Sequence, residues 1–410
     1  MAVGPELFPT MLPINGFKLG TTSAEIKTPN RRDLVVMEVV ENATIAGVFT
    51  LNRFCAAPVL ICQQHLAEIA GAVNAKRYLV TNTGYANAGT GPDGYKNSQA
   101  VCERLGKMTG VSTENVLPYS TGVIGEHLPV EVINGALIRC LDGLSESGWD
   151  DAAFGIMTTD TRPKGSSRSL VINGETISIT GISKGSGMIM PNMATMLAYV
   201  ATDVGLSQSL AEELLKEAAD QSFNQATVDG DTSTNDSCML IATDAANLRF
   251  ETAEDQGYSL FKEALFAVCV ELAQAIIRDG EGATKFVTVR VEQANTREEA
   301  RCVAYTVAHS PLVKTALFAS DPNWGRILAA IGRAPIDELD VANVSVYLDD
   351  VLLAEQGGVA RSYREADGAK VMANDEFSIV IKLGRGDVSA DVWTCDFSYD
   401  YVKINAEYRS

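Results

Sequence analysis

Short apolar strands alternate with amphipathic helices along the chain, and this alternation restricts it to a mixed α/β fold. The segments "RRDLVVMEVV" (31–40) and "TIAGVFT" (44–50) predict two early strands, and "KRYLVTNTGYANAGTG" (76–91) predicts a strand that runs into a loop rich in Gly and Asn. The segment 58–73 predicts a helix near its end, and "CMLIAT" (238–243) predicts another strand. We therefore expect sheets packed with helices and several antiparallel strand pairs.

Two segments carry a strong strand signal. In "SLVINGETISITGI" (169–182), Asn173-Gly174 supplies the two positive-φ residues of a tight type I′ turn between alternating strands, which predicts a hairpin. In "KFVTVRVEQ" (285–293), the valines at 287, 289 and 291 alternate with polar residues. This period of two is typical of a strand with one buried face.

Helix signals lie between these strands. The segment 205–223 has apolar residues at helical spacing, with Ser207 or Ser209 as its cap, and 259–278 is a long apolar helix that ends at Asp279-Gly280. Asp321-Pro322 predicts a further helix start, with the aspartate as the cap and the proline in the first turn. No repeat, low-complexity stretch or polar linker divides the chain.

Composition excludes several classes of protein. The 410 residues can bury one large core or two, and the formal net charge of −19 argues against binding to nucleic acid. The eight cysteines are scattered singly, with no Cys-x-x-Cys pair, and are typical of core residues in a reduced protein. The three histidines match no ligand spacing, so we expect no metal; we interpret them as structural, with the role of His309, beside a helix start, left open. The N-terminus does not resemble a signal peptide and no apolar run has the length of a membrane span, so we expect a soluble, cytoplasmic protein.

Two common nucleotide-binding motifs are missing. No Gly-x-Gly-x-x-Gly follows a strand, and no Gly-Lys-Ser/Thr loop occurs. "GTGPDG" (89–94) is rich in glycine, but we predict no helix after it, so its signal for phosphate binding is weak.

The stretch "KGSGMIMPNMATMLAY" (184–199) combines a loop rich in Gly, Met and Pro with a buried strand that starts at Thr195. A threonine hydroxyl is a poor nucleophile unless a base lies beside it, and the α-amino group of an N-terminal threonine is such a base. Cleavage of the Ala194–Thr195 bond would create that amine, and Thr195 could perform it through an N-to-O acyl shift. The ordinary alternative is that Thr195 is only a β-favouring residue at a strand start.

Several blocks of sequence resemble the ornithine acetyltransferase family, the glutamate N-acetyltransferases of the arginine pathway. The resemblance is carried by 184–197 and, in the order of the family, by "STGVIGEHLP" (120–129), "MTTDTRPK" (157–164), "DGDTSTNDS" (229–237), "GEGATKF" (280–286), "SPLVKTALFASDPNWGRI" (310–327) and "YVKINAEYRS" (401–410). These blocks cover most of the chain.

The resemblance implies a fold and a reaction. The fold is of the self-cleaving N-terminal-nucleophile type, related to certain aminopeptidases, and the precursor divides into an α chain (1–194) and a β chain (195–410) that assemble as an α2β2 heterotetramer. The reaction moves an acetyl group from N-acetylornithine to glutamate without a cofactor, and some members also use acetyl-CoA as a substrate.

The resemblance also implies roles for individual residues. Thr195 is the nucleophile, and Thr121 and Gly122 form the oxyanion hole. The family pattern places substrate contacts at Thr158, Lys184, Thr195, Glu281, Asn405 and Ser410.

Chemistry is compatible with these roles, although each residue also has a plainer interpretation. Lys184 suits a substrate carboxylate, and the glycine-flanked Glu281 suits an ammonium; otherwise both are surface residues. Thr121-Gly122 could be an ordinary turn, and Thr158 a strand or cap hydroxyl. Ser410 replaces the threonine usual in the family, and Tyr85 stands where asparagine is common.

Two other functions remain open from the sequence. One is a related self-cleaving aminopeptidase or amidohydrolase, which would deliver the acyl group to water. The other is an amino-acid-binding protein that never cleaves itself.

Overall fold

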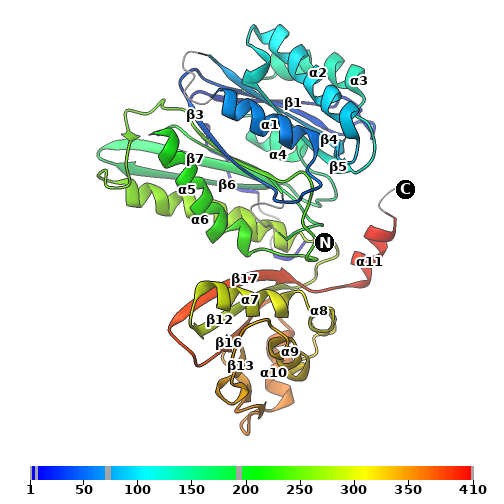
Figure 1. Ribbon diagram of the computed structural model, residues 1–410, viewed down its shortest axis with the longest axis vertical. Helices are drawn as coiled ribbons and strands as arrows, with labels where there is room; N and C mark the ends of the chain where they lie inside the picture. The colour runs from blue at the N-terminus through cyan, green and yellow to red at the C-terminus, as the bar shows by residue number, and fades with distance from the viewer. Residues whose placement is uncertain (1, 5–7, 70–74, 191–195, 408–410) are drawn as a thin grey trace. The chain divides into compact units, whose positions relative to one another are not determined.

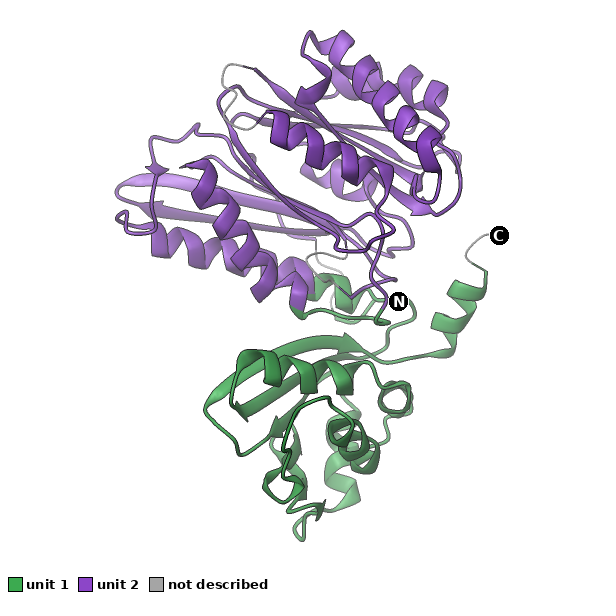
Figure 2. Ribbon diagram, in the orientation of Figure 1, with its two compact units in different colours: residues 1–6, 225–230, 274–410 green, residues 7–224, 231–273 purple. Residues whose placement is uncertain are grey.

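The chain folds into two compact units. The computed structural model describes residues 2–4, 8–69, 75–190 and 196–407 (Figure 1). Unit 1 contains residues 1–6, 225–230 and 274–410, and unit 2 contains 7–224 and 231–273 (Figure 2). The boundary falls within helix α6 (Tyr258–Arg278) and not at residue 194. The predicted division into chains 1–194 and 195–410 describes the cleavage of a peptide bond and not the boundary of a folded unit, and it stays a prediction.

The first sheet of unit 2 has the strand order β1-β2-β4-β5. Strands β1, β2 and β4 are antiparallel neighbours, and β5 runs parallel to β4. The strands are β1 (Phe17–Thr22), β2 (Leu34–Val39), β4 (Arg77–Tyr85) and β5 (Val116–Val123).

The second sheet of unit 2 has the order β3-β10-β8-β7-β6. Strands β8 and β10 are parallel and the other pairs are antiparallel. Every residue of β8 is buried, because the sheet is covered on both faces. The strands are β3 (Thr44–Phe49), β6 (Lys164–Ile172), β7 (Glu175–Lys184), β8 (Leu197–Thr202) and β10 (Ser237–Ala242), and β9 (Gly205–Leu206) pairs with β11 (Arg249–Phe250) outside this sheet.

The two sheets face each other across a hydrophobic core. The rings of Tyr119 and Tyr199 meet edge to face with centroids 5.2 Å apart, and the Tyr199 hydroxyl lies 2.8 Å from that of Thr81. Helices α2 and α3 cover the outer face of the first sheet, and α5 covers the second (Figure 1). The helices that lie wholly in this unit are α1 (Ala57–Glu68), α2 (Gly91–Thr109), α3 (Val130–Asp142), α4 (Trp149–Gly155) and α5 (Gln208–Gln221), and the first part of α6, up to residue 273, also belongs to it.

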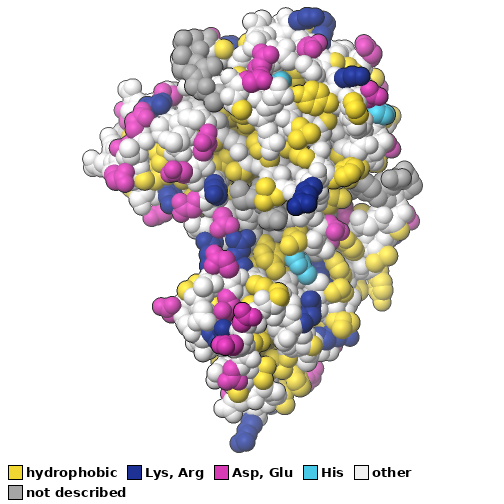
Figure 3. Space-filling model, in the orientation of Figure 1, with side chains coloured by type: hydrophobic (Ala, Val, Ile, Leu, Met, Phe, Trp, Pro, Cys, Tyr) yellow, Lys and Arg dark blue, Asp and Glu magenta, His cyan; other side chains and the backbone are white. Residues whose placement is uncertain are grey.

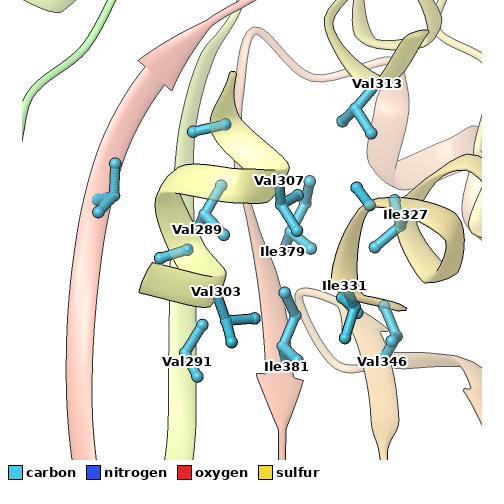
Figure 4. Close-up of a cluster of buried hydrophobic side chains, with 14 of the residues drawn as sticks. Val289, Val291, Val303, Val307, Val313, Ile327, Ile331, Val346, Ile379 and Ile381 are labelled. Carbon is cyan, nitrogen blue, oxygen red and sulfur yellow. The ribbon is translucent and has the colours of Figure 1, made fainter. Parts of the chain in front are cut away.

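Unit 1 is a six-stranded sheet, in the order β15-β14-β13-β16-β12-β17, with helices packed on it. In its core, alternate valines and isoleucines of β12 and β16 pack against apolar residues of α7 and α9 (Figure 4). The strands are β12 (Phe286–Ala294), β13 (Ser345–Leu348), β14 (Val351–Glu355), β15 (Gly358–Val359), β16 (Glu376–Lys382) and β17 (Val388–Cys395). The helices are α7 (Arg297–Ala308), α8 (Pro311–Phe318), α9 (Trp324–Gly332), α10 (Glu365–Met372) and α11 (Tyr399–Ala406).

The predicted mixed α/β fold is confirmed, and so are its clearest local elements. Asn173 and Gly174 both have positive φ, 53° and 87°, between the paired strands β6 and β7. Strand β12 buries Val287, Val289 and Val291, as its alternation predicted.

Four local predictions were wrong. The helix expected near the end of the segment 58–73 is α1, which begins at Ala57 and ends at Glu68. A helix does follow "GTGPDG", since α2 begins at Gly91 with Pro92 in its first turn. Helix α9 begins at Trp324 with Asn323 as its cap, because the Asn323 side chain accepts a hydrogen bond from the backbone N–H of Arg326. Ser207 does precede α5, but its hydroxyl donates to the carbonyl of Glu251 and does not cap the helix.

The state of the cysteines and the distribution of surface charge can be compared with what the composition suggested. All eight cysteines are free thiols, and acidic and basic side chains are interspersed on the face drawn in Figure 3. Among the helices described, none is both long and apolar enough to span a membrane.

Candidate active site

Two of the predicted site residues meet in unit 2. The Lys184 ammonium donates a hydrogen bond of 3.2 Å to the Thr121 hydroxyl. Thr121 lies near the end of β5 in the first sheet and is only 8% exposed, whereas Lys184 is the last residue of β7 in the second sheet. The contact places a hydroxyl and an ammonium together where the two sheets face each other.

Gly122 occupies a position that only glycine can take. Its φ is 135°, and a Cβ there would lie 2.2 Å from the carbonyl carbon of Gly84 and 2.6 Å from the backbone nitrogen of Tyr85. The pairing of β4 with β5 shifts register at Gly84 and Tyr85. Such irregularities redirect backbone groups near active sites, and this one lies beside the predicted oxyanion-hole residue.

Asp160 anchors the loop that carries Thr158. Its carboxylate accepts hydrogen bonds from the backbone N–H groups of Thr158 at 2.9 Å and Gly185 at 2.7 Å, and from the Lys164 ammonium at 2.6 Å. Burial raises the pKa of this carboxyl, but the charges of Lys164 and Lys184 outweigh burial and hold it well below its usual range. Asp160 therefore fixes the backbone at two predicted substrate contacts: at Thr158 itself, and at Gly185, the residue that follows Lys184.

Thr158 lines a cavity of about 430 Å³. The cavity is bounded by residues 30–32 on one side and by Phe154, Met157, Thr158 and Asp160 on the other. The Arg31 guanidinium donates to the carbonyls of Met157 and Thr158 at 2.6 and 2.8 Å, which holds this wall in place.

Asn235 and Asp236 form a further part of the site that sequence reasoning missed. Asn235 donates from its side-chain amide to the carbonyls of Ala86 and Ser120 at 2.5 and 2.9 Å, and so fixes the backbone just before Thr121. Both residues belong to the block "DGDTSTNDS", which was the only available signal.

Asp236 is a buried carboxyl close to the start of β8. It is 3% exposed, its Oδ2 makes no hydrogen bond, and the next residue, Ser237, donates its backbone N–H to the carbonyl of Met196. Burial raises the pKa of Asp236 well above its usual range, against the opposing effects of hydrogen bonds from Ser233 and the charge of Lys184. The ammonium of Lys184 therefore lies within the electrostatic reach of two buried carboxyls, Asp160 and Asp236.

A second pair of predicted residues meets in unit 1. The Asn405 side chain donates to the Glu281 carboxylate at 2.8 Å, and Glu281 is 6% exposed. At Gly282, φ is 68° and a Cβ would lie 2.5 Å from the backbone nitrogen of Tyr401, so the loop lies directly against α11. The predicted close approach at this glycine-flanked glutamate is thus made to the chain's own C-terminal helix.

The remaining predictions fall in other places. Ala194, Thr195 and Ser410 lie outside the described residues. His309 is near Thr227, with 3.0 Å between ring nitrogen and hydroxyl, and burial together with the charges of Lys314 and Arg333 lowers its pKa to about 4. No group of three metal-ligating side chains occurs in the part of the chain that the structure describes.

A threonine hydroxyl, a glycine with positive φ and an ammonium lie together at the facing ends of strands. Such a combination is suited to stabilising the oxyanion of an acyl-transfer reaction. The chain belongs to the ArgJ family, whose model matches residues 18–410. This confirms the resemblance to the ornithine acetyltransferases.

Two curated relatives match the whole chain over their own whole length. Both carry the name arginine biosynthesis bifunctional protein ArgJ; the protein from Pseudomonas fluorescens is 56% identical over 411 residues, and that from Pseudomonas syringae pv. tomato is 57% identical over 412.

Two solved structures are also similar. The crystal structure of arginine biosynthesis bifunctional protein ArgJ from Bacillus halodurans is 36% identical, covers 52% of this chain and 99% of its own, and has a TM-score of 0.49. Ornithine acetyltransferase from Mycobacterium tuberculosis, complexed with ornithine, is 30% identical, covers 45% of this chain and 95% of its own, and has a TM-score of 0.39.

Proposed function

We propose that the chain is a glutamate N-acetyltransferase of arginine biosynthesis that moves an acetyl group from N2-acetyl-L-ornithine to L-glutamate. Membership of the ArgJ family gives the reaction class. The observation that carries the proposal is the contact between Lys184 and Thr121. It brings together an ammonium that can bind a substrate carboxylate and a hydroxyl that can donate a hydrogen bond to the oxyanion. The products are ornithine and N-acetylglutamate.

The nucleophile in this proposal is Thr195 after self-cleavage. Attack of the Thr195 hydroxyl on the Ala194 carbonyl converts the peptide bond into an ester, and water then hydrolyses that ester. The products are an α chain that ends at Ala194 and a β chain that begins with a free threonine amine. An α-amino group has a pKa of about 7.7–8.0, so part of it is neutral and basic at pH 7.

The same hydroxyl then carries the acetyl group. It attacks the acetyl carbonyl of the donor, the threonine amine takes its proton, and the negative oxygen of the tetrahedral intermediate is stabilised by the Thr121 hydroxyl and the Gly122 N–H. The C–N bond breaks, and the proton passes to the departing ornithine amine. Glutamate then attacks the acetyl-threonine ester in the reverse sense and restores the free hydroxyl.

Charged groups bind the amino-acid parts of the substrates in this scheme. The Lys184 ammonium pairs with a substrate carboxylate, while Glu281, with Asn405 and Ser410, pairs with the ammonium of the ornithine side chain. The α and β chains assemble as α2β2, acetyl-CoA serves as a second acetyl donor, and no cofactor takes part. Eight free cysteines fit a reducing compartment, and we place the enzyme in the cytoplasm.

Initial-rate kinetics and mass spectrometry test the reaction. An acetyl-enzyme predicts parallel double-reciprocal lines for N-acetylornithine against glutamate. It also predicts one added acetyl group on the β chain after incubation with the donor alone. Intersecting lines, or no acetylated β chain at saturating donor, contradict the scheme.

The same assay separates the alternatives. A related aminopeptidase or amidohydrolase would release acetate from N-acetylornithine at the same rate with and without glutamate. An amino-acid-binding protein would remain one uncut chain and release neither product.

A further inference from the structure

The cavity beside Thr158 has the size and lining of a ligand site. Its volume of about 430 Å³ lies within the range of small-molecule pockets. It belongs entirely to unit 2, between the segment 30–32 and the segment 154–160. The amino-acid scheme above uses only Thr158 of this lining, so most of the cavity has no assigned ligand.

Two adjacent arginines give the cavity a positive wall. Arg31 uses one terminal nitrogen for the carbonyls of Met157 and Thr158, and a guanidinium has five N–H groups. Arg32 pairs with Asp151 at 2.6 Å, and both side chains of this pair are about half exposed, 46% and 58%. An exposed ion pair contributes little, so a multiply charged anion can replace Asp151 at Arg32.

The acidic group in the lining does not cancel this charge. The Asp160 carboxylate is fully buried and is paired with the equally buried Lys164 at 2.6 Å. It also accepts the two backbone hydrogen bonds described above. The arginines therefore set the sign of the cavity, in a chain whose net charge is −19. A guanidinium is well matched to phosphate because it donates parallel hydrogen bonds.

An exposed aromatic ring completes the lining. Phe154, on α4, is 46% exposed and borders the same cavity. Flat rings of this kind bind bases by stacking. Arginines and an open aromatic ring together are suited to a nucleotide that carries several phosphates.

One residue of the cavity lining, Asp160, is connected to the proposed catalytic residues through hydrogen bonds. Asp160 accepts a hydrogen bond from Gly185, the neighbour of Lys184, and Lys184 contacts the Thr121 hydroxyl. A donor bound by a nucleotide end in the cavity could thus extend a flexible arm toward the oxyanion hole. Acetyl-CoA has this construction, with a phosphorylated adenosine at one end and the reactive thioester at the other.

We propose that the cavity formed by residues 30–32 and 154–160 binds the adenosine phosphate end of acetyl-CoA, with Arg32 on the phosphates and Phe154 against the base. The inference rests on the proposed function, since it locates the second acetyl donor of that enzyme. N-acetylornithine has no nucleotide and does not use Arg32 or Phe154.

Donor kinetics of surface variants test the site. Arg32→Ala is expected to raise the KM for acetyl-CoA about tenfold or more, with an unchanged KM for N-acetylornithine, because only the former loses a charged hydrogen bond. Phe154→Ala is expected to act in the same direction. Arg249→Ala is the matched control, because Arg249 is a similarly exposed, ion-paired arginine of the same unit, and it should change neither KM.

Calorimetry with adenosine 3′,5′-bisphosphate provides a second readout that needs no turnover. The unmodified enzyme should bind this fragment, and Arg32→Ala should bind it at least tenfold more weakly. Equal changes in both KM values, or a fragment that binds the two proteins alike or not at all, overturn the site. If N-acetylornithine transfer persists without any use of acetyl-CoA, this inference fails and the acetylornithine reaction stands. If neither donor reacts, the proposed function fails, and fragment binding alone decides whether the cavity is a nucleotide site.

Discussion

The Lys184 ammonium and the Thr121 hydroxyl, 3.2 Å apart, join the ends of strands from two different sheets. Because the hydroxyl oxygen accepts from the ammonium, its own O–H is the group left to donate. A neighbouring positive charge polarises that O–H and strengthens it as a donor. In the proposed scheme, the contact thus links substrate binding at Lys184 to oxyanion stabilisation at Thr121.

Removal of the Thr121 hydroxyl should slow turnover without unfolding the protein. We expect Thr121→Ala to lower kcat by about 10²–10³-fold, the usual loss for one oxyanion donor. Steady-state kinetics with N-acetylornithine and glutamate measure this effect, with the circular dichroism spectrum and Tm as checks on folding. Thr121→Ser keeps a hydroxyl and should recover most of the activity. A well-folded Thr121→Ala enzyme with normal kcat would remove Thr121 from the mechanism.

Self-cleavage should depend on the residue at position 195. The unmodified protein is expected to show two fragments on a denaturing gel, with the C-terminal fragment beginning TMLAYV. Thr195→Ala should give a single full-length chain, because alanine has no hydroxyl for the acyl shift. Intact masses and N-terminal sequencing measure both. Cleavage of Thr195→Ala at the same bond would refute the nucleophile assignment.

Local patterns were sufficient to predict much of the fold. The Asn173-Gly174 hairpin and strand β12 follow from turn chemistry and alternating burial, both of which are written in a few neighbouring residues. The start of α9 was misplaced because Asp321-Pro322 and Asn323 offer competing caps two residues apart, and only the hydrogen bond to Arg326 decides between them. Helix α2 was missed because the glycines and the proline of 89–94 have low helix propensity, while packing of Val101 and Leu105 on the first sheet stabilises it.

Long-range contacts explain what the sequence could not predict about the site. Thr121 and Lys184 are 63 residues apart, and Asn235 reaches the carbonyl of Ser120 across 115 residues. Neither separation has a periodic signature. Family motifs marked Thr121, Lys184 and Thr158, but the anchoring roles of Asp160 and Asn235 depend on burial and partners that only the folded chain reveals.

Asp160 and Lys164 form a buried ion pair, and we expect that removing one partner destabilises the protein more than removing both. Their side chains are 0% and 1% exposed. We expect Lys164→Met to lower the free energy of unfolding by about 3–5 kcal/mol, because it leaves a buried carboxylate without its ammonium. The double variant Asp160→Asn with Lys164→Met should recover a large part of that loss. Denaturant titrations of the two single variants and the double variant measure the coupling, and strictly additive effects would contradict it.

Asp236 should make stability depend on pH in the opposite sense to an ordinary ion-paired carboxyl. Its folded pKa is raised above the unfolded value by burial, so both states are protonated at low pH and the full stability is present there. As the pH rises, the unfolded chain loses this proton first, and stability is lost until the pH exceeds the folded pKa. Asp236→Asn cannot titrate, so the Tm of the unmodified protein minus that of Asp236→Asn should fall as the pH rises from below the pKa of an unfolded aspartate toward the raised pKa of folded Asp236.

Thermal unfolding at a series of pH values measures this difference. Asp142→Asn, at an exposed position of the same unit, controls for the general effect of removing a carboxyl. The Asp236 result should be specific, because the buried Oδ2 has no hydrogen-bond partner to hold a negative charge. A difference in Tm that stays constant with pH would mean that folding does not shift the pKa of Asp236. A difference that grows in favour of the unmodified protein as the pH rises would mean that folding lowers this pKa, and either result would contradict the raised pKa.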